Sequence, residues 1–299
     1  MFSFTKEQEV FDISGIKIGG QPGVYPTVLI GGLFFKGEPD FNKAEGQLKK
    51  MYDLSKRTGN PSIPDFFIRK EEYVENMVNF IEKTIPKDQP FSVDIIDANI
   101  KIKVLEALHE KKLLSRTIYN SIHIGITDEE RDALKKFTPE AVILVAFNPK
   151  DKSPDGKIEV LASGANLLDK GLLDVTKEIG MKKILVDTAA MAPGDNSGAS
   201  ISAIPVIKEE YGLPVGCAIH NVVEKSSWID DFENKRKPVD AASNINIPLF
   251  GGDFAVFGPI ANSDLVFPMI AWEDILVSEY AESYFGMEPC SYHPRRKLL

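Results

Sequence analysis

Four short apolar segments in the middle of the chain each end in Asp or Asn, and a helical pattern follows each of them. The segments are FSVDIID (91–97), RTIYNSI (116–122), ILVDTAA (184–190) and PVGCAIHN (214–221). Repeated alternation of strand and helix predicts a parallel sheet, because the helix must carry the chain back to the edge where the next strand starts. The carboxyl ends of these strands then present their polar side chains on one side of the sheet.

The same alternation runs along the rest of the chain. We expect strands at 27–35, 65–68, 91–95, 116–120, 141–146, 183–187, 214–219 and 253–257. We expect helices at 41–57, 71–85, 99–111, 127–137, 166–179, 198–211, 222–236 and 263–285, a loop over KDKSPDGK (150–157), and a β-hairpin at 10–18. No Pro/Gly/Ser-rich linker divides these units, which favours a single domain over residues 1–299. Eight units predict an α/β fold of the (β/α)8 or TIM-barrel type, since a Rossmann-like sheet would need a GxGxxG turn after its first strand.

The composition excludes several classes of function. The formal net charge is -9 and the isoelectric point is about 5.1, which disfavours nucleic-acid binding because phosphates need clustered Lys and Arg. Cys217 and Cys290 form no CxxC or Cys/His pattern, so we expect no metal site. The longest apolar run, AVILVAF (141–147), is too short to cross a membrane, and the first ten residues lack a signal-peptide pattern. We therefore expect a cytoplasmic protein without a membrane segment.

The strand ends supply the first set of candidate site residues. Asp94, Asn120, Asp187 and Asn221 lie in, end or follow predicted strands, and His220 precedes Asn221. An unpaired carboxylate in an apolar strand is costly, so each aspartate needs a donor, either from a structural salt bridge or from a ligand. A ligand with an amino group beside a ring N–H, as in a pterin, would supply such donors. The sequence shows no Ser-His-Asp set, histidine cluster or phosphate loop, which favours this neutral heterocycle over a phosphate or a metal.

Other polar residues near the strand ends have two interpretations each. Asp97 is either a rim group or the N-cap of the next helix, and Asn148, which precedes Pro149, is either a rim group or part of a turn. The loop MAPGDNSGAS (191–200) either caps the following helix or lets a planar ligand approach its small residues closely. Its candidate binding residues are Asp195, Asn196, Ser197, Gly198 and Ser200.

Longer segments, which together span nearly the whole chain, resemble one known family. They include IKIGGQPGVYPTVLIGGLFF (16–35), IYNSIH (118–123), VDTAAMAPGDNSGASISAIPVIK (186–208), LPVGCAIHN (213–221) and FGPIANSDLVFP (257–268). In these segments the chain is similar to the H subunit of tetrahydromethanopterin S-methyltransferase and its bacterial relatives. That family shares a pterin-binding barrel with cobalamin-dependent methyltetrahydrofolate methyltransferases and dihydropteroate synthase. The resemblance therefore implies a TIM barrel of the pterin-binding type.

The resemblance also implies an activity and a set of roles. The activity is methyl transfer between N5 of a reduced pterin and the cobalt of a corrinoid. Asp94 or Asp97, with Asn120 and Asp187, would hold the pterin ring, and Asn221 or its neighbour His220 would act near N5. The chain has no DxHxxG motif to ligate cobalt, so the resemblance implies that a separate corrinoid protein brings the cobalamin. Related barrels commonly pair, so we expect a homodimer.

The resemblance leaves open which pterin is used. We favour tetrahydrofolate, as in the demethylation of glycine betaine or other methylamines, over the tetrahydromethanopterin of the archaeal family. A dihydropteroate synthase-like enzyme is less favoured, because it would need basic groups for a pyrophosphate and the strand ends supply almost none. A pterin-binding subunit without turnover is the non-enzymatic alternative, and the intact polar rim favours an enzyme over it.

Overall fold

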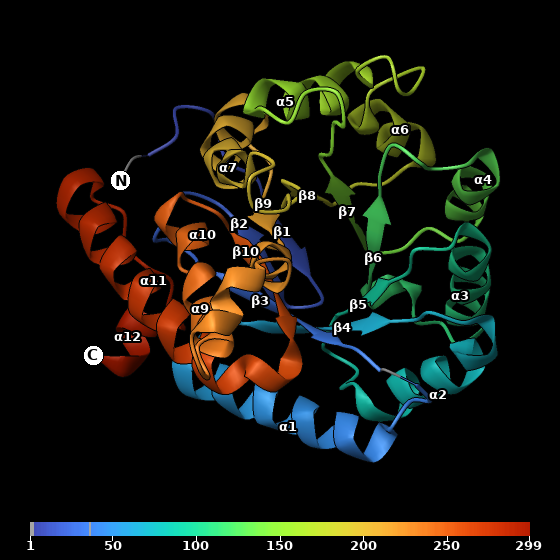
Figure 1. The fold of residues 1–299 in the computed structure, drawn as a ribbon, viewed down its shortest axis with the longest axis horizontal. Helices are drawn as coiled ribbons and strands as arrows, with labels where there is room; N and C mark the ends of the chain where they lie inside the picture. The colour runs from blue at the N-terminus through green and yellow to red at the C-terminus, as the bar shows by residue number, and fades with distance from the viewer. Residues whose placement is uncertain (1–2, 36) are drawn as a thin grey trace.

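Eight parallel strands close into a barrel in the computed structural model, which describes residues 3–35 and 37–299 (Figure 1). Around the barrel they run in chain order, and β10 pairs with β3 to close it. The strands are β3 (Val28–Leu33), β4 (Ser62–Phe67), β5 (Phe91–Asp94), β6 (Thr117–Ile122), β7 (Ala141–Val145), β8 (Ile184–Asp187), β9 (Val215–Cys217) and β10 (Phe254–Pro259). The predicted (β/α)8 fold is confirmed, and all carboxyl ends of the strands face the same side.

Helices surround the barrel and bury the outer face of every strand (Figure 1). They are α1 (Phe41–Thr58), α2 (Val74–Thr84), α3 (Ala98–Glu110), α4 (Asp128–Lys136), α5 (Pro154–Ser163), α6 (Leu172–Ile179), α7 (Ser197–Tyr211), α8 (His220–Glu224), α9 (Arg236–Ser243), α10 (Asn246–Leu249), α11 (Ser263–Phe285) and α12 (Pro294–Leu298). The strands are buried on both faces, which explains why they appear in the sequence as short continuous apolar runs. No helix among the described residues is both long enough and apolar enough to cross a bilayer.

An antiparallel hairpin of β1 (Val10–Ile13) and β2 (Ile16–Gly19) precedes the barrel, as the sequence predicts. Its Ile13, Ile16 and Ile18 belong to the apolar cluster that fills the inside of the barrel. The turn residues Ser14 and Gly15 both have positive φ, and the carboxylate of Asp12 accepts the Gly15 N–H at 2.7 Å. The hairpin therefore packs on the barrel interior, and the polar strand ends lie at the carboxyl-terminal face.

The unit between β7 and β8 differs from the prediction. The predicted loop at 150–157 contains the start of α5, because the Ser153 hydroxyl accepts the Gly156 N–H at 3.2 Å and Pro154 suits the first helical turn. The predicted helix at 166–179 begins only at Leu172, since Ala165 and Asn166 have positive φ, which an α-helix excludes.

The unit after β9 also differs, because three short helices and a 3-10 turn replace the single helix predicted at 222–236. The Arg236 guanidinium explains the break. It donates to the carbonyls of Val223 and Ser226 at 2.6 and 3.0 Å, and so satisfies groups that would otherwise continue the helix. Residues from α8 and α9 consequently line the cavity that opens at the strand ends, as described below.

Candidate active site

A cavity of about 910 Å³ opens at the carboxyl-terminal ends of the strands. Asp94 ends β5 and lies opposite Asn120 of β6 in the strand register, while Asp187 ends β8. His220 and Asn221 start α8, directly after β9. All five residues line this one cavity, so side chains from distant parts of the sequence converge there.

A third aspartate in the cavity, Asp65 of β4, was missed in the sequence analysis. It is buried, and its Oδ2 accepts a hydrogen bond from Asn120 Nδ2 at 3.3 Å. Its Oδ1 has no hydrogen-bond partner among the described residues. The sequence pattern did not reveal Asp65, because Pro61 and Pro64 interrupt the apolar run that is typical of a buried strand. In the barrel, however, Pro64 belongs to β4 and pairs in register with Gly31 of β3.

Burial raises the pKa of each of the three strand aspartates, Asp65, Asp94 and Asp187. Burial raises the pKa of Asp94 to about 8, with a further contribution from the charge of Asp65 and an opposing one from Lys101. Burial also raises the pKa values of Asp65 and Asp187, each to about 6. At pH 7 the cluster therefore combines a protonated carboxyl at Asp94 with ionised carboxylates, so it offers both a hydrogen-bond donor and acceptors.

The raised pKa of Asp94 predicts that this site destabilises the protein at alkaline pH. Its native pKa of about 8 lies above the unfolded value of about 3.9, so the native state binds the extra proton. The resulting stabilisation is complete below pH 4, falls as the pH rises to 8, and is absent above pH 8. We expect Asp94→Asn to be more stable than the wild type at pH 9 by on the order of 5 kcal/mol, because a shift of about four pKa units contributes about 1.4 kcal/mol per unit, and nearly equal at pH 4. Urea unfolding at several pH values measures this, and a pH-independent difference would contradict it.

Several polar groups in the cavity lack protein partners. No described residue donates a hydrogen bond to the carboxyl of Asp94 or pairs with the side-chain amide of Asn221. Asp187 uses Oδ1 to accept the Ala189 N–H at 2.7 Å. Phe34, 44% exposed, adds an aromatic face. Unsatisfied acceptors beside an aromatic ring suit a flat heterocycle that carries several N–H groups.

The two histidines of the cavity, His123 and His220, are neutral at pH 7. Burial lowers the pKa of each imidazole. His123 Nδ1 accepts the Gly125 N–H at 2.9 Å, so its proton resides on Nε2. The His220 ring packs on Gly258, which has a φ of +81° and where a Cβ would lie 2.7 Å from the ring. Glycine at 258 therefore permits the position of His220.

The cavity wall is more basic than the sequence analysis expected. Lys225, Arg236 and Lys237 all line it. They were missed because they lie on α9 or just after α8, and not at a strand end. Arg236 pairs with Asp230, whereas Lys225 and Lys237 form no ion pair with a described residue. The cavity thus joins an acidic floor to a wall that carries both the unpaired Lys225 and Lys237 and the carboxylates of Glu224 and Asp240.

Asp97 and Asn148 do not line the cavity, which favours the N-cap and turn interpretations over the prediction that they are binding residues of the rim. Asp97 is exposed and caps α3, where its Oδ1 accepts two N–H groups at 2.9 and 3.1 Å. Asn148 is buried, and its Oδ1 accepts two N–H groups of the following turn while its Nδ2 donates to the Gly156 carbonyl. Both side chains thus hold local structure, at the start of α3 and in the turn before α5.

The predicted binding residues of the 191–200 loop also lie outside the cavity, because α7 begins within this loop. Asp195 pairs with Lys152, and Ser200 is buried and donates to the Ala189 carbonyl at 2.9 Å. The others form the N-cap and first residues of α7, namely Asn196, Ser197 and Gly198. The preceding residues 189–191 line the cavity instead.

Solved structures with a similar fold are dihydropteroate synthases. The enzyme from Xanthomonas albilineans with 4-aminobenzoic acid aligns with a TM-score of 0.62 and 14% identity, over 89% of this chain and 98% of that one. The Yersinia pestis enzyme aligns with a TM-score of 0.59 and 13% identity, over 92% and 98%. At such identities the likeness shows the fold alone. The chain is a TIM barrel with the fold of these enzymes.

Sequence comparison identifies the family. The model of the family "Tetrahydromethanopterin S-methyltransferase MtrH subunit" matches residues 6–290, and the chain belongs to this family. The H subunit of tetrahydromethanopterin S-methyltransferase from Methanothermobacter thermautotrophicus is 38% identical over 313 aligned positions, with 100% of both chains covered. The Methanosarcina barkeri protein of the same name is 35% identical, again with 100% of both chains covered. The resemblance stated from the sequence is confirmed.

Proposed function

We propose that this chain, acting as one domain over residues 1–299, transfers a methyl group between N5 of a tetrahydropterin and a corrinoid carried by a separate protein. The observation that carries the proposal is the convergence on one cavity of the strand residues Asp65, Asp94, Asn120 and Asp187 with Asn221 at the start of α8. The names of the relatives favour tetrahydromethanopterin over the tetrahydrofolate that the sequence analysis preferred. We therefore take tetrahydromethanopterin as the expected pterin, with tetrahydrofolate as the comparison.

The floor of the cavity is suited to hold the pterin ring. Ionised Asp187 and Asp65 accept hydrogen bonds from the amino group and ring N–H of the pterin. Protonated Asp94 donates to a ring acceptor, and Asn120 supplies a carbonyl oxygen because its amide donates to Asp65. Four groups on adjacent or nearby strands fix the ring in one orientation, which aligns N5 for transfer.

Asn221 and His220 are the groups proposed to act near N5. The corrinoid supplies the cobalt that exchanges a methyl group with this nitrogen. Methylation of N5 releases one proton, and removal of the methyl group requires N5 to be protonated or strongly hydrogen-bonded. Asn221 does not titrate, so its amide orients N5 or a water molecule while the proton is exchanged with solvent.

Calorimetric titration with each reduced pterin, followed by an assay with methylcobalamin, tests the proposal. We expect tighter binding of tetrahydromethanopterin than of tetrahydrofolate, and loss of the methyl-cobalt absorbance when the pterin is added. A pterin-binding subunit without turnover would bind the pterin and leave the absorbance unchanged. Product from 4-aminobenzoate and a pterin pyrophosphate would favour the dihydropteroate synthase-like alternative. Failure to bind either reduced pterin would overturn the proposal.

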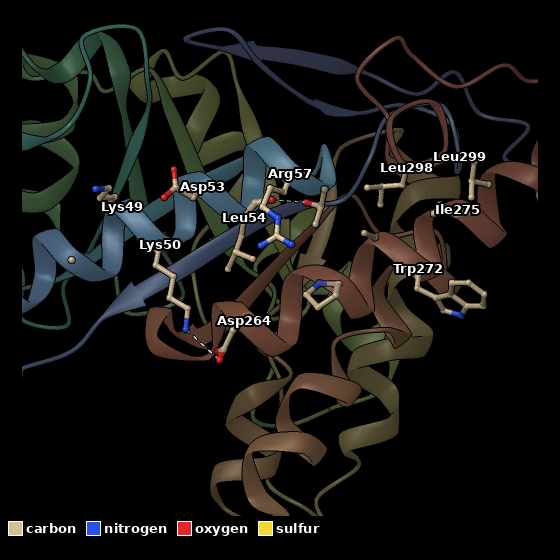
Figure 2. A pocket seen from close by; sticks show the side chains of 14 residues that line it. Lys49, Lys50, Asp53, Leu54, Arg57, Asp264, Trp272, Ile275, Leu298 and Leu299 are labelled. Atoms are coloured by element: carbon tan, nitrogen blue, oxygen red, sulfur yellow. Dashed lines mark hydrogen bonds and ion pairs between the residues drawn. The ribbon is translucent and has the colours of Figure 1, made fainter.

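A second groove, of about 880 Å³, provides the surface for the expected homodimer (Figure 2). It lies outside the barrel between α1, α11 and the C-terminal residues, with the 63% exposed Trp272 along its edge. On α11, Trp272, Leu276 and Tyr284 are exposed at multiples of four residues, so they form one apolar ridge. The groove also carries charges of both signs that form no ion pair with described residues, namely Lys49, Arg57 and Asp53. A surface with both a ridge and a groove, and both signs of charge, can complement a second copy of itself.

We expect Trp272→Glu to dissociate the dimer, because it places a charge in the apolar ridge. Light scattering after size-exclusion chromatography measures the mass, and the variant should run near the 33.1 kDa of one chain. Trp228→Glu is the control, since Trp228 is similarly exposed, at 57%, but lies in the segment between α8 and α9. A dimer that survives Trp272→Glu would exclude this surface.

A further inference from the structure

A buried lysine lies behind the strand that carries Asp187. Lys157, on α5, has no exposed surface, and its Nζ lies 3.4 Å from the carbonyl oxygen of Ala189. It forms no ion pair within 4 Å with any described residue. An ammonium group with one long carbonyl contact and no carboxylate partner is costly to bury, so nearby negative charge is needed to keep Lys157 protonated.

Asp187 is the source of that charge. Burial lowers the pKa of Lys157. The charge of Asp187 is the largest of the effects that raise this pKa, and the effects of Cys217 and Asp151 are smaller. The Cys217 thiol stays neutral because burial raises its pKa, and Asp151 is fully exposed to solvent screening. Among the described residues, Asp187 on β8 is therefore the buried carboxylate whose charge most raises the pKa of this lysine.

Lys157 also fixes the turn that follows Asp187. Ala189 has a φ of +57° and lines the cavity. Its N–H donates to Asp187 Oδ1 at 2.7 Å, while its carbonyl oxygen accepts the Ser200 hydroxyl at 2.9 Å and faces Lys157 Nζ. The lysine therefore acts on the charge of Asp187 and on the backbone that orients it.

We propose that Lys157 is a positioning residue, which holds the Asp187 turn from behind β8 and keeps the Asp187 carboxylate ionised in the buried floor of the cavity. The inference rests on the proposed function only for the identity of the ligand. A ligand edge that carries N–H donors requires an ionised Asp187 carboxylate as the hydrogen-bond acceptor at neutral pH.

Lys101 provides a matched control. It is also a buried lysine on a helix behind the barrel, where it donates to the Ser121 carbonyl at 2.8 Å. Unlike Lys157, it has its own carboxylate, since its Nζ lies 2.9 Å from Glu130 Oε1. The charge of Lys101 lowers the pKa of Asp94, and Lys101 is not among the groups that shift the pKa of Asp187. Lys101→Met should therefore leave Asp187 unaffected.

The decisive measurement is an NMR titration of carboxyl-labelled aspartates without ligand, with the Asp187 signal assigned from Asp187→Asn. Loss of a nearby opposite charge raises a carboxyl pKa by about 1 or more, so we expect that rise at Asp187 in Lys157→Met. Lys157→Arg should restore a value close to the wild type, and Lys101→Met should leave it unchanged. If Lys157→Met does not fold, Lys157→Gln keeps a donor near Ala189 without the charge. An unchanged Asp187 titration in a folded variant would overturn the inference.

Ligand binding gives a second readout. The dissociation constant of Lys157→Met for the pterin should exceed that of the wild type about 10-fold near pH 5 and about 3-fold near pH 6.5, and the ratio should approach 1 near pH 9, where Asp187 is ionised in both proteins. A purely structural role for Lys157 would give the same ratio at every pH and would contradict the proposal. If the wild type binds no pterin, the proposed function fails, and the ligand-free titration still decides the role of Lys157.

Discussion

Asp187→Ala is expected to weaken binding of the reduced pterin by about 100-fold at pH 8, which corresponds to roughly 3 kcal/mol. The wild-type carboxylate is ionised at this pH, because its pKa is raised by burial only to about 6. Alanine removes a charged acceptor from the buried floor and leaves the donor edge of the ligand without a partner. Calorimetric titration measures the effect. The difference should shrink at pH 5, where the wild-type carboxyl is itself protonated.

Two companion variants make this prediction specific. Asp97→Ala is the matched control, because it removes an exposed carboxylate that caps α3 outside the cavity, so pterin binding should not change. Asp187→Asn retains the shape of the side chain without the charge, and most of the affinity should be lost in this variant too. Circular dichroism must accompany both Asp187 variants, since Lys157 loses its counter-charge in each. A loss of less than about 3-fold in folded Asp187→Ala would remove Asp187 from the proposed site.

The sequence predicted the parallel sheet because its strands are buried on both faces, as the apolar segment 141–145 illustrates. Eight such strand–helix units, without a GxGxxG turn after the first strand, favoured the closed barrel over an open doubly wound sheet. The same regularity located Asp94, Asn120, Asp187 and Asn221, since a polar residue at the end of an apolar strand must face the carboxyl-terminal side. These predictions required only local patterns and the geometry of parallel strands.

The remaining site residues depend on tertiary structure that local patterns do not reveal. Asp65 was missed because Pro64 reads as a strand breaker, although it is accommodated within β4. Lys225 and Lys237 were missed because a helical pattern at 222–236 does not show that Arg236 breaks the helix. Asp97 and Asn148 were placed in the site although local N–H groups satisfy them, and sequence alone leaves both interpretations open.

Asn221→Ala is expected to reduce turnover by about 100-fold or more, while the pterin dissociation constant changes by less than about 3-fold. The reason is that different residues of the cavity bind the ring and act at N5. The aspartates and Asn120 hold the ring in the ground state, whereas the Asn221 amide, which has no described protein partner, is free to act where charge develops at N5. Single-turnover rates with methylcobalamin, combined with calorimetry, separate the two quantities.

His220→Ala identifies which of two neighbours acts near N5, because His220 and Asn221 both line the cavity and both start α8. The imidazole is neutral and packed against the backbone of Gly258, so its loss should leave a void with only a moderate effect on turnover. A selective loss of turnover in His220→Ala, with little effect in Asn221→Ala, would instead assign the role to the histidine. Equal losses of affinity and turnover in both variants would contradict the separation of ring binding from N5 chemistry, because one group would then be serving both.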